Sequence, residues 1–167
     1  MNSCILICYN ILSALLPSRW HAIRRHILLA AGCEIGKGVS LNAYTQCAGN
    51  AIEIGDNTWI SSGTHILSSF VPSERVKIGN CCDVGPEVLF VNGTHQIGSC
   101  HRRAGEGRCL PITIGDGCWI GARAVILGGA TIGSGCVVAA GSVVIPGDYP
   151  SNCLLAGVPV IIKKQLK

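Results

Sequence analysis

His95 is the residue in this sequence best suited to acid–base chemistry. It follows Asn92-Gly93-Thr94 in a polar stretch between two segments of regular aliphatic pattern. Histidine is the usual general base near neutral pH, so His95 could accept the proton of an attacking hydroxyl. On its own it could equally be a polar loop residue. The stretch continues to Arg102-Arg103, two cations that could pair with a neighbouring subunit or reach its ligand.

A six-residue aliphatic period predicts the fold that positions His95. Ile or Val recurs at every sixth position from Ile114 to Val144, and Gly or Ala often follows it. A second small residue recurs with the same period at Cys118, Ala124, Ala130, Cys136 and Ser142. This period fits neither an amphipathic helix nor a simple alternating strand. It fits a triangular coil with one short strand per side, whose turns stack ~4.8 Å apart. We predict an all-β fold, a left-handed parallel β-helix of about five 18-residue coils over residues 33–150.

The spacing between coil starts predicts where the chain leaves this helix. A short excursion is expected near Ser68 to Arg75, and a long one over residues 92–111. The long one cannot be another coil, because its inward positions would be Gln96, Arg102 and Arg108. Long loops are more often functional than incidental. After Val144 the next inward position is Pro150, so we expect the coil to end there and residues 151–167 to form a tail.

The segment before the repeats, residues 1–32, is predicted to be a helical cap. Its apolar run from Cys4 to Leu16 is too short to span a bilayer as a helix. Ser18 is expected to cap a helix that runs to Ala31, with Gly32 as its stop. The expected apolar face is Trp20, Ile23, Ile27, Leu28 and Ala31, opposite Arg19, His21, Arg25 and His26. This helix should cover the end of the core, and peripheral contact with an anionic membrane is the alternative.

Composition limits the remaining function classes. The 167 residues suffice for one domain, and a net charge of +4 without a dense basic run gives no reason to expect nucleic-acid binding. The eleven cysteines are odd in number and include no Cys-x-x-Cys pair. We interpret most of them as small buried hydrophobic residues in a reducing compartment. The expected location is therefore the cytoplasm, or the inner face of the membrane if the helix makes that contact.

Stacking of the coils predicts a groove on one side. The residues preceding the inward aliphatic there form a column of Trp59, Asp83, Trp119 and Val137. Beside this column, Gly121-Ala122 and Ala139-Ala140 put very small side chains on adjacent coils. Bare backbone beside an indole could bind a long thin ligand with amide groups, such as pantetheine. The same residues could instead be small because a neighbouring subunit packs there.

Three motifs resemble the hexapeptide acyltransferases, in the branch of galactoside and maltose O-acetyltransferases. They are Pro111 to Ala122, Ala139 to Val144, and Ala156-Gly157-Val158-Pro159, together with Gly93-Thr94-His95 in the loop. Arg102-Arg103-Ala104-Gly105 is similar to members that modify cell-surface glycans. The resemblance implies a homotrimer with active sites between subunits, acetyl-CoA as co-substrate and no tightly bound cofactor.

The resemblance also implies roles for individual residues. His95 would be the catalytic base, and the backbone N–H of Ala122 would stabilise the oxyanion. The residues expected to bind CoA or the oxyanion are Trp119, Gly121, Ala122, Ala139, Ala140, Pro146, Lys163 and Lys164. Those expected to bind the acceptor are Trp59, Ser61, Asp83, Asn92, Arg102 and Arg103. The family's acceptor-side Asn is Ser61 here, and its basic residues near the CoA phosphates are Val160 and Ile161.

We therefore expect an acetyl-CoA-dependent O-acetyltransferase that acts on a hydroxyl of a sugar or a cell-envelope polysaccharide unit by direct attack. N-acetylation of an amino sugar, or a serine or antibiotic acetyltransferase, is the alternative within the family. A zinc enzyme like the γ-class carbonic anhydrases would use His65, His95 and His101. A catalytically inactive scaffold is a further reading. The O-acetyltransferase interpretation expects no metal ion in the site.

Overall fold

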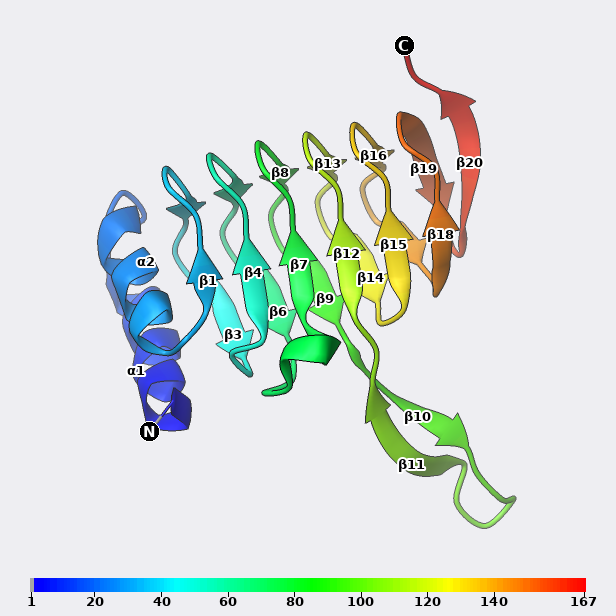
Figure 1. The fold of residues 1–167 in the computed structure, drawn as a ribbon, viewed down its shortest axis with the longest axis horizontal. Coiled ribbons are helices and arrows are strands. Elements are labelled where there is room, and N and C mark those ends of the chain that lie inside the picture. The colour runs from blue at the N-terminus through cyan, green and yellow to red at the C-terminus, as the bar shows by residue number, and fades with distance from the viewer. Residues whose placement is uncertain (1) are drawn as a thin grey trace.

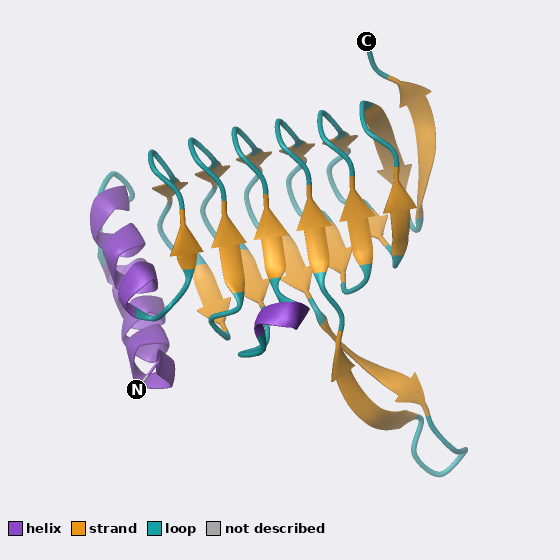
Figure 2. Cartoon of the chain, in the orientation of Figure 1, coloured by secondary structure: helices purple, strands orange, loops and turns teal. Residues whose placement is uncertain are grey.

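Three parallel sheets, wound into a left-handed triangular β-helix, form the body of the molecule (Figures 1 and 2). The structure, a computed structural model, describes residues 2–167. Sheet 1 has the strand order β1 (Glu34–Ile35), β4 (Ile52–Ile54), β7 (Val76–Ile78), β12 (Ile112–Ile114), β15 (Ala130–Ile132), β18 (Gly147–Tyr149). Sheet 2 has the order β2 (Ser40–Leu41), β5 (Trp59–Ile60), β8 (Asp83–Val84), β13 (Trp119–Ile120), β16 (Val137–Val138), β19 (Cys153–Gly157), β20 (Val160–Gln165). Sheet 3 has β3 (Gln46–Ala48), β6 (His65–Leu67), β9 (Leu89–Val91), β14 (Val125–Leu127) and β17 (Val143–Val144). The predicted fold class is confirmed.

The six-residue period forms the core. The residues from Ile114 to Val144 that recur at this period, one per side of each coil, are all buried in the interior of the prism. The small residues of the second period, from Cys118 to Ser142, are buried with them. Each buried aliphatic side chain contributes about 1.5–3 kcal/mol through removal of its surface from water.

Most of the cysteines are buried, as predicted. Six are buried: Cys33, Cys47, Cys82, Cys118, Cys136 and Cys153. Cys4, Cys8, Cys81 and Cys100 are exposed, and all eleven are free thiols. Burial raises the pKa of the Cys33 thiol to about 12, so this sulfur stays protonated at neutral pH.

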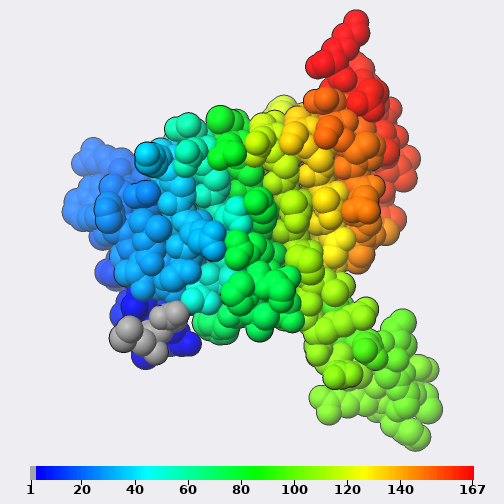
Figure 3. Space-filling view, in the orientation of Figure 1, coloured from blue at the N-terminus to red at the C-terminus, as the bar shows by residue number. Residues whose placement is uncertain are grey.

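Both predicted excursions are present. The shorter one contains the 3₁₀ helix η1 (Pro72–Glu74). The longer one is an antiparallel hairpin of β10 (Gly93–Ile97) and β11 (Ala104–Cys109), which projects from the body (Figures 1 and 3). It joins β9 of sheet 3 to β12 of sheet 1, so it leaves the prism at the corner opposite sheet 2.

The N-terminal region contains two helices, α1 (Asn2–Leu15) and α2 (His21–Ala30), where one was expected. The short apolar run is α1, and it packs on β3 while α2 packs on β1 and β2. Ser18 is not the cap of α2, because the N-cap position is Trp20 and no side chain caps it. Gly32 does end α2: its φ is +89°, and the N–H of Cys33 donates to the carbonyl of Leu28.

The expected apolar face of α2 also needs correction. Leu28 and Ala31 are buried, but Trp20 and Ile23 are exposed. Arg24 is buried instead, and its guanidinium donates to the carbonyls of Ser13, Leu16, Pro17 and Ser18. Ser13 lies in the last turn of α1, and the other three residues form the connection from α1 to α2. Arg24 therefore closes α1 and joins it to α2.

The coil does not end at Pro150, as we had expected. β18 pairs with β15 and β19 pairs with β16, which adds two sides of a sixth coil. Strand partners Ile132 and Tyr149 are 17 residues apart, whereas Ile114 and Ile132 are 18 apart. One residue is missing from this coil, so counting by sixes put Pro150 in an inward position that Tyr149 occupies. The expected tail is β19 and an antiparallel strand, β20.

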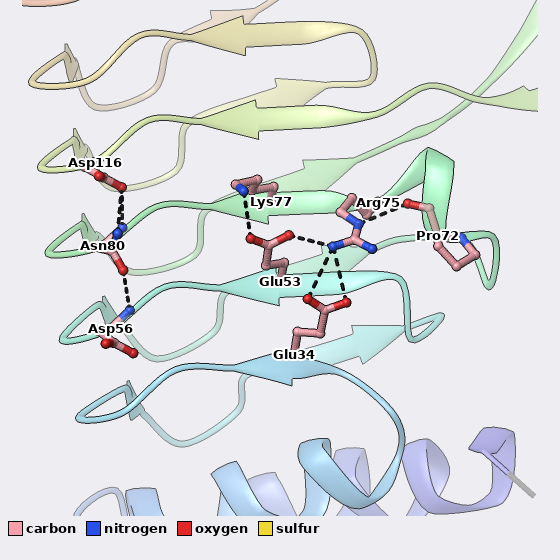
Figure 4. A network of polar contacts seen from close by, with 8 residues as sticks. All are labelled: Glu34, Glu53, Asp56, Pro72, Arg75, Lys77, Asn80 and Asp116. Atoms are coloured by element: carbon pink, nitrogen blue, oxygen red, sulfur yellow. Dashed lines mark hydrogen bonds and ion pairs between the residues drawn. The ribbon is translucent and has the colours of Figure 1, made fainter.

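Polar side chains join successive coils on the outside of the prism (Figure 4). At one corner, the carboxylate of Asp116 accepts from the N–H of Asn80, and the side-chain oxygen of Asn80 accepts from the N–H of Asp56. On sheet 1, Glu53 pairs with Arg75 at 2.6 Å and with Lys77 at 2.8 Å. These bonds fix each coil in register with the next.

Candidate active site

The hairpin that carries His95 is held at its base by Asn92. The Asn92 side chain is only 2% exposed, and its Nδ2 donates to the carbonyl of Glu74 at 2.6 Å. The carbonyl of Asn92 accepts from the N–H of Leu110 across the base. The Asn92 amide nitrogen is therefore bound inside the fold, and contact of this residue with an acceptor stays a prediction.

His95 is exposed on β10, opposite Gly107 of β11. A Cβ on Gly107 would lie 3.5 Å from Nε2 of His95, so the imidazole packs over this glycine. The ladder shifts register between His95 and Ile97, which bends the strand just beyond the histidine. At the end of the hairpin, Arg102 and Arg103 are exposed, and Arg103 donates to the carbonyl of Gly98.

The predicted tryptophan column exists on sheet 2. Strand pairing aligns Trp59 with Asp83, Asp83 with Trp119, and Trp119 with Val137. A pocket of about 340 Å³ lies between the two indoles, lined by Trp59, Ser61, Asp83, Val84, Gly85 and Trp119. Nε1 of Trp59 donates to the hydroxyl of Ser61 at 3.2 Å. Aromatic faces around a carboxylate suit a ligand with both apolar faces and hydroxyl groups, such as a sugar.

A second hollow continues the column toward the corner that sheet 2 shares with sheet 3. It has a volume of about 460 Å³ and is lined by Pro86, Glu87, Ala122, Arg123, Ala140 and Gly141. Arg123 pairs with Glu87 at 2.6 Å at its rim, which lowers the pKa of Glu87. The N–H of Ala122 has no hydrogen-bond acceptor among residues 2–167. A backbone donor left free in a hollow can bind a ligand oxygen.

Gly121 has a different role from that of its neighbours. It is buried, and its N–H donates to the carbonyl of Val138. A Cβ at this position would lie 2.5 Å from the backbone nitrogen of Ala140. Gly121 is thus required for the close stacking of two coils, and Ala122 and Ala140 supply the exposed strip.

The remaining candidates are dispersed in the single chain. Pro146 lines a small pocket at the hairpin base with Thr94 and Arg108. Lys163 and Lys164 are exposed on β20. Because the hairpin leaves the corner opposite sheet 2, His95 and the Trp59–Trp119 pocket lie on different sides of one chain (Figure 1).

The three histidines of the zinc alternative are also dispersed. His65 lies on β6 of sheet 3, His95 lies on β10, and His101 lies in the hairpin turn. Over residues 2–167, no group of three or more His, Cys, Asp or Glu side chains is placed to hold a metal ion.

Known proteins are similar to this chain in sequence and in fold. Residues 111–146 match the family described as bacterial transferase hexapeptide, six repeats. The galactoside O-acetyltransferase of Escherichia coli is 35% identical over 129 residues, which cover 68% of this chain and 63% of that protein. The chain belongs to the hexapeptide-repeat acetyltransferase family.

Two solved members of the hexapeptide-repeat acetyltransferase family share the fold over 99% of this chain. One is from Vibrio cholerae, in complex with acetyl-CoA, with a TM-score of 0.85, 29% identity and 87% of its length covered. The other is a galactoside acetyltransferase in complex with coenzyme A, with a TM-score of 0.85, 25% identity and 81% covered. This chain spans about three fifths of the length of the curated relatives it matches.

Proposed function

We propose that this chain is an acetyl-CoA-dependent O-acetyltransferase that acts on a hydroxyl of a sugar or a cell-envelope polysaccharide unit. The observation that carries the proposal is the sheet 2 surface, where a pocket between two indoles and a carboxylate adjoins a strip with a free backbone N–H. The pocket suits the acceptor and the strip suits the pantetheine of CoA. The eleven free thiols suit a reducing compartment, so we place the reaction in the cytoplasm.

The reaction in this proposal is a direct transfer. The acceptor hydroxyl attacks the thioester carbonyl while His95 takes its proton, and a C–O bond forms as the carbonyl becomes an oxyanion. The N–H of Ala122 stabilises this oxyanion, a contribution of about 3 kcal/mol for donors of this type. Collapse of the intermediate breaks the C–S bond, and the CoA thiolate leaves with the proton that His95 returns. A positioned base contributes about 10²–10⁴-fold.

A homotrimer would bring the two halves of the site together. One chain places His95 and the sheet 2 pocket on different sides, so the site is incomplete without a partner copy. Sheet 3 offers an outward surface that is mostly aliphatic, made by Leu67, Leu89, Val91, Val125, Leu127 and Val143. A closed ring in which the sides of three prisms meet would bury that surface and bring each hairpin to the sheet 2 of a neighbour.

Two experiments test this function. Release of free thiol from acetyl-CoA, measured with a panel of neutral sugars, acidic sugars and amino sugars, should show turnover with hydroxyl acceptors. Alkali-labile product would identify an ester, whereas stable product would identify N-acetylation and contradict the proposal. No thiol release with any acceptor would also contradict it.

Subunit mixing tests the shared site. A His95→Ala chain and a Trp119→Ala chain should each be inactive. After exchange at equal amounts, about a quarter of the sites should combine an intact histidine with an intact tryptophan. Activity should then return. Absence of recovery despite proven exchange, or a monomer by light scattering, would contradict the shared site.

A further inference from the structure

The outer face of α1 is apolar although it does not pack on the coil. Its exposed stripe consists of Cys4, Ile7, Cys8, Ile11 and Leu15, which recur at helical spacing. Ile7 is 59% exposed, Ile11 57% and Leu15 74%. The buried side consists of Leu6, Tyr9 and Ser13, with Ile5 and Asn10 half-buried beside them. A helix on a protein surface usually turns a polar face to solvent, whereas α1 is apolar on its outer face as well as toward the core.

Asn10 fixes α1 in this orientation. Its Nδ2 donates to the carbonyl of Cys47 at 3.0 Å, and its Oδ1 accepts from the N–H of Cys47 at 2.9 Å. Arg24 holds the C-terminal end of the helix through four carbonyls. The helix therefore cannot roll to bury Ile7 and Ile11 without breaking these bonds.

The helical layer also carries positive charge at its surface, through Arg19. Arg19, which precedes α2, is exposed, as are His26 and Ile23 of α2, the latter at 43%. Residues 2–33 contain no Asp or Glu, so the helical layer has no acidic side chain. The two helices lie side by side at the end of the prism opposite β20 (Figures 1 and 3). Neither helix, nor any other in residues 2–167, is long and apolar enough to cross a membrane.

We propose that the outer face of α1, together with the exposed side of α2, docks this protein on an anionic membrane surface. The helices lie in the plane of the interface. Aliphatic side chains enter the boundary between headgroups and acyl chains, and Arg19 and His26 contact lipid phosphates. The exposed aliphatic area supplies the main attraction, and the cations select negatively charged lipid.

Charge favours lipid over a second copy of this chain. In a twofold contact each copy presents the same patch, so the cationic side chains of one layer would meet those of the other without an acidic partner. An anionic lipid surface can pair those that are exposed, such as Arg19. In the trimer proposed above, parallel prisms would present three such layers at one end, and a flat bilayer could contact all three. The docking itself does not depend on the trimer.

Co-sedimentation with lipid vesicles tests the proposal without any assay of activity. The full chain should sediment with mixed phosphatidylglycerol–phosphatidylcholine vesicles and much less with pure phosphatidylcholine. The variant Ile7→Gln/Ile11→Gln should bind at least about tenfold more weakly, because two half-exposed aliphatic side chains are lost. Arg19→Glu should weaken binding about fivefold or more, and added salt should do the same.

Ile161→Gln/Ile162→Gln is the matched control, since these residues are 57% and 50% exposed at the opposite end of the prism. It should bind vesicles as the unaltered chain does. Glutamine keeps helix propensity, and circular dichroism would verify that each variant is folded. Equal loss in the control, full binding by Ile7→Gln/Ile11→Gln, or equal binding to both vesicle types would overturn the proposal. So would larger assemblies of the unaltered chain that the α1 variant abolishes, because the face would then join copies of this chain.

Discussion

His95 lies directly opposite Gly107 in the β10–β11 hairpin, and its imidazole packs over the space that a side chain at Gly107 would fill. A methyl group there would lie 3.5 Å from Nε2, which is an ordinary contact. The glycine therefore provides the surface on which the proposed base is oriented.

Gly107→Val should displace that imidazole. A branched side chain adds a methyl group beyond the first contact, and small misplacements of a catalytic group can cost up to about a hundredfold in rate. We expect kcat to fall by roughly ten- to a hundredfold while the KM for acetyl-CoA is unchanged. Gly107→Ala is the matched control and should keep most of its activity. Equal kcat values for both variants would show that Gly107 does not position His95.

Ala140→Leu should block the CoA strip and leave the fold intact. Ala140 is exposed beside Ala122, so a larger side chain would enter the hollow and not the core. We expect the KM for acetyl-CoA to rise at least about tenfold, the equivalent of one lost aliphatic contact. Thr131→Leu, exposed on sheet 1, is the control. An unchanged KM would remove the strip from the CoA site.

Gly121→Val should act on stability and not on CoA affinity. The added Cβ would lie 2.5 Å from a backbone nitrogen of the next coil, where nothing flexible can move away. A clash of this kind should cost about 2 kcal/mol or more and lower the melting temperature. A variant of normal stability that had lost CoA binding would contradict this assignment.

Arg24→Met should destabilise the helical layer. The side chain keeps its approximate volume but removes the guanidinium that donates to four carbonyls, and hydrogen bonds to charged groups are worth about 1.5–3 kcal/mol. We expect the free energy of unfolding to fall by about 2–3 kcal/mol in denaturant titration. Arg19→Met, on the exposed side of the layer, should change it by less than about 0.5 kcal/mol.

Glu53→Gln should reduce stability in a pH-dependent way. Burial alone would raise the pKa of Glu53, but hydrogen bonds from Lys77 and Arg75 outweigh it and hold this pKa below its usual value. The stabilisation is therefore present above the unfolded-state pKa of about 4.3 and is lost as the pH falls through the lower folded-state value. We expect a deficit of about 0.5–1 kcal/mol at neutral pH that disappears toward roughly pH 3. Glu87→Gln, whose Arg123 pair is exposed, should show no measurable deficit.

Most of the fold could be predicted from the repeat. Each side of a coil places one aliphatic residue in the core, and this produces a six-residue period that can be counted in the sequence. The count failed at Pro150, where a single missing residue shifts the coil and no motif in the sequence marks the shift. Arg24 was missed because the carbonyls it binds belong to another segment, which no helical wheel represents. The Trp59–Asp83–Trp119 column could also be predicted, because the same repeat places equivalent residues of successive coils next to one another. The role of Asn92 could not be predicted, because its partner, Glu74, comes from the other excursion.

The alignment of Trp59 and Trp119 in one column also limits how this fold can adapt to ligands of different length. Asp83 lies between them, so the indoles are two strand spacings apart, or roughly 10 Å. Any side chain moved along sheet 2 must move by a whole coil, in steps of ~4.8 Å. Contacts to a bound ligand can therefore be shifted along sheet 2 only by whole coil spacings. Finer changes in specificity must come from the type of residue at each position.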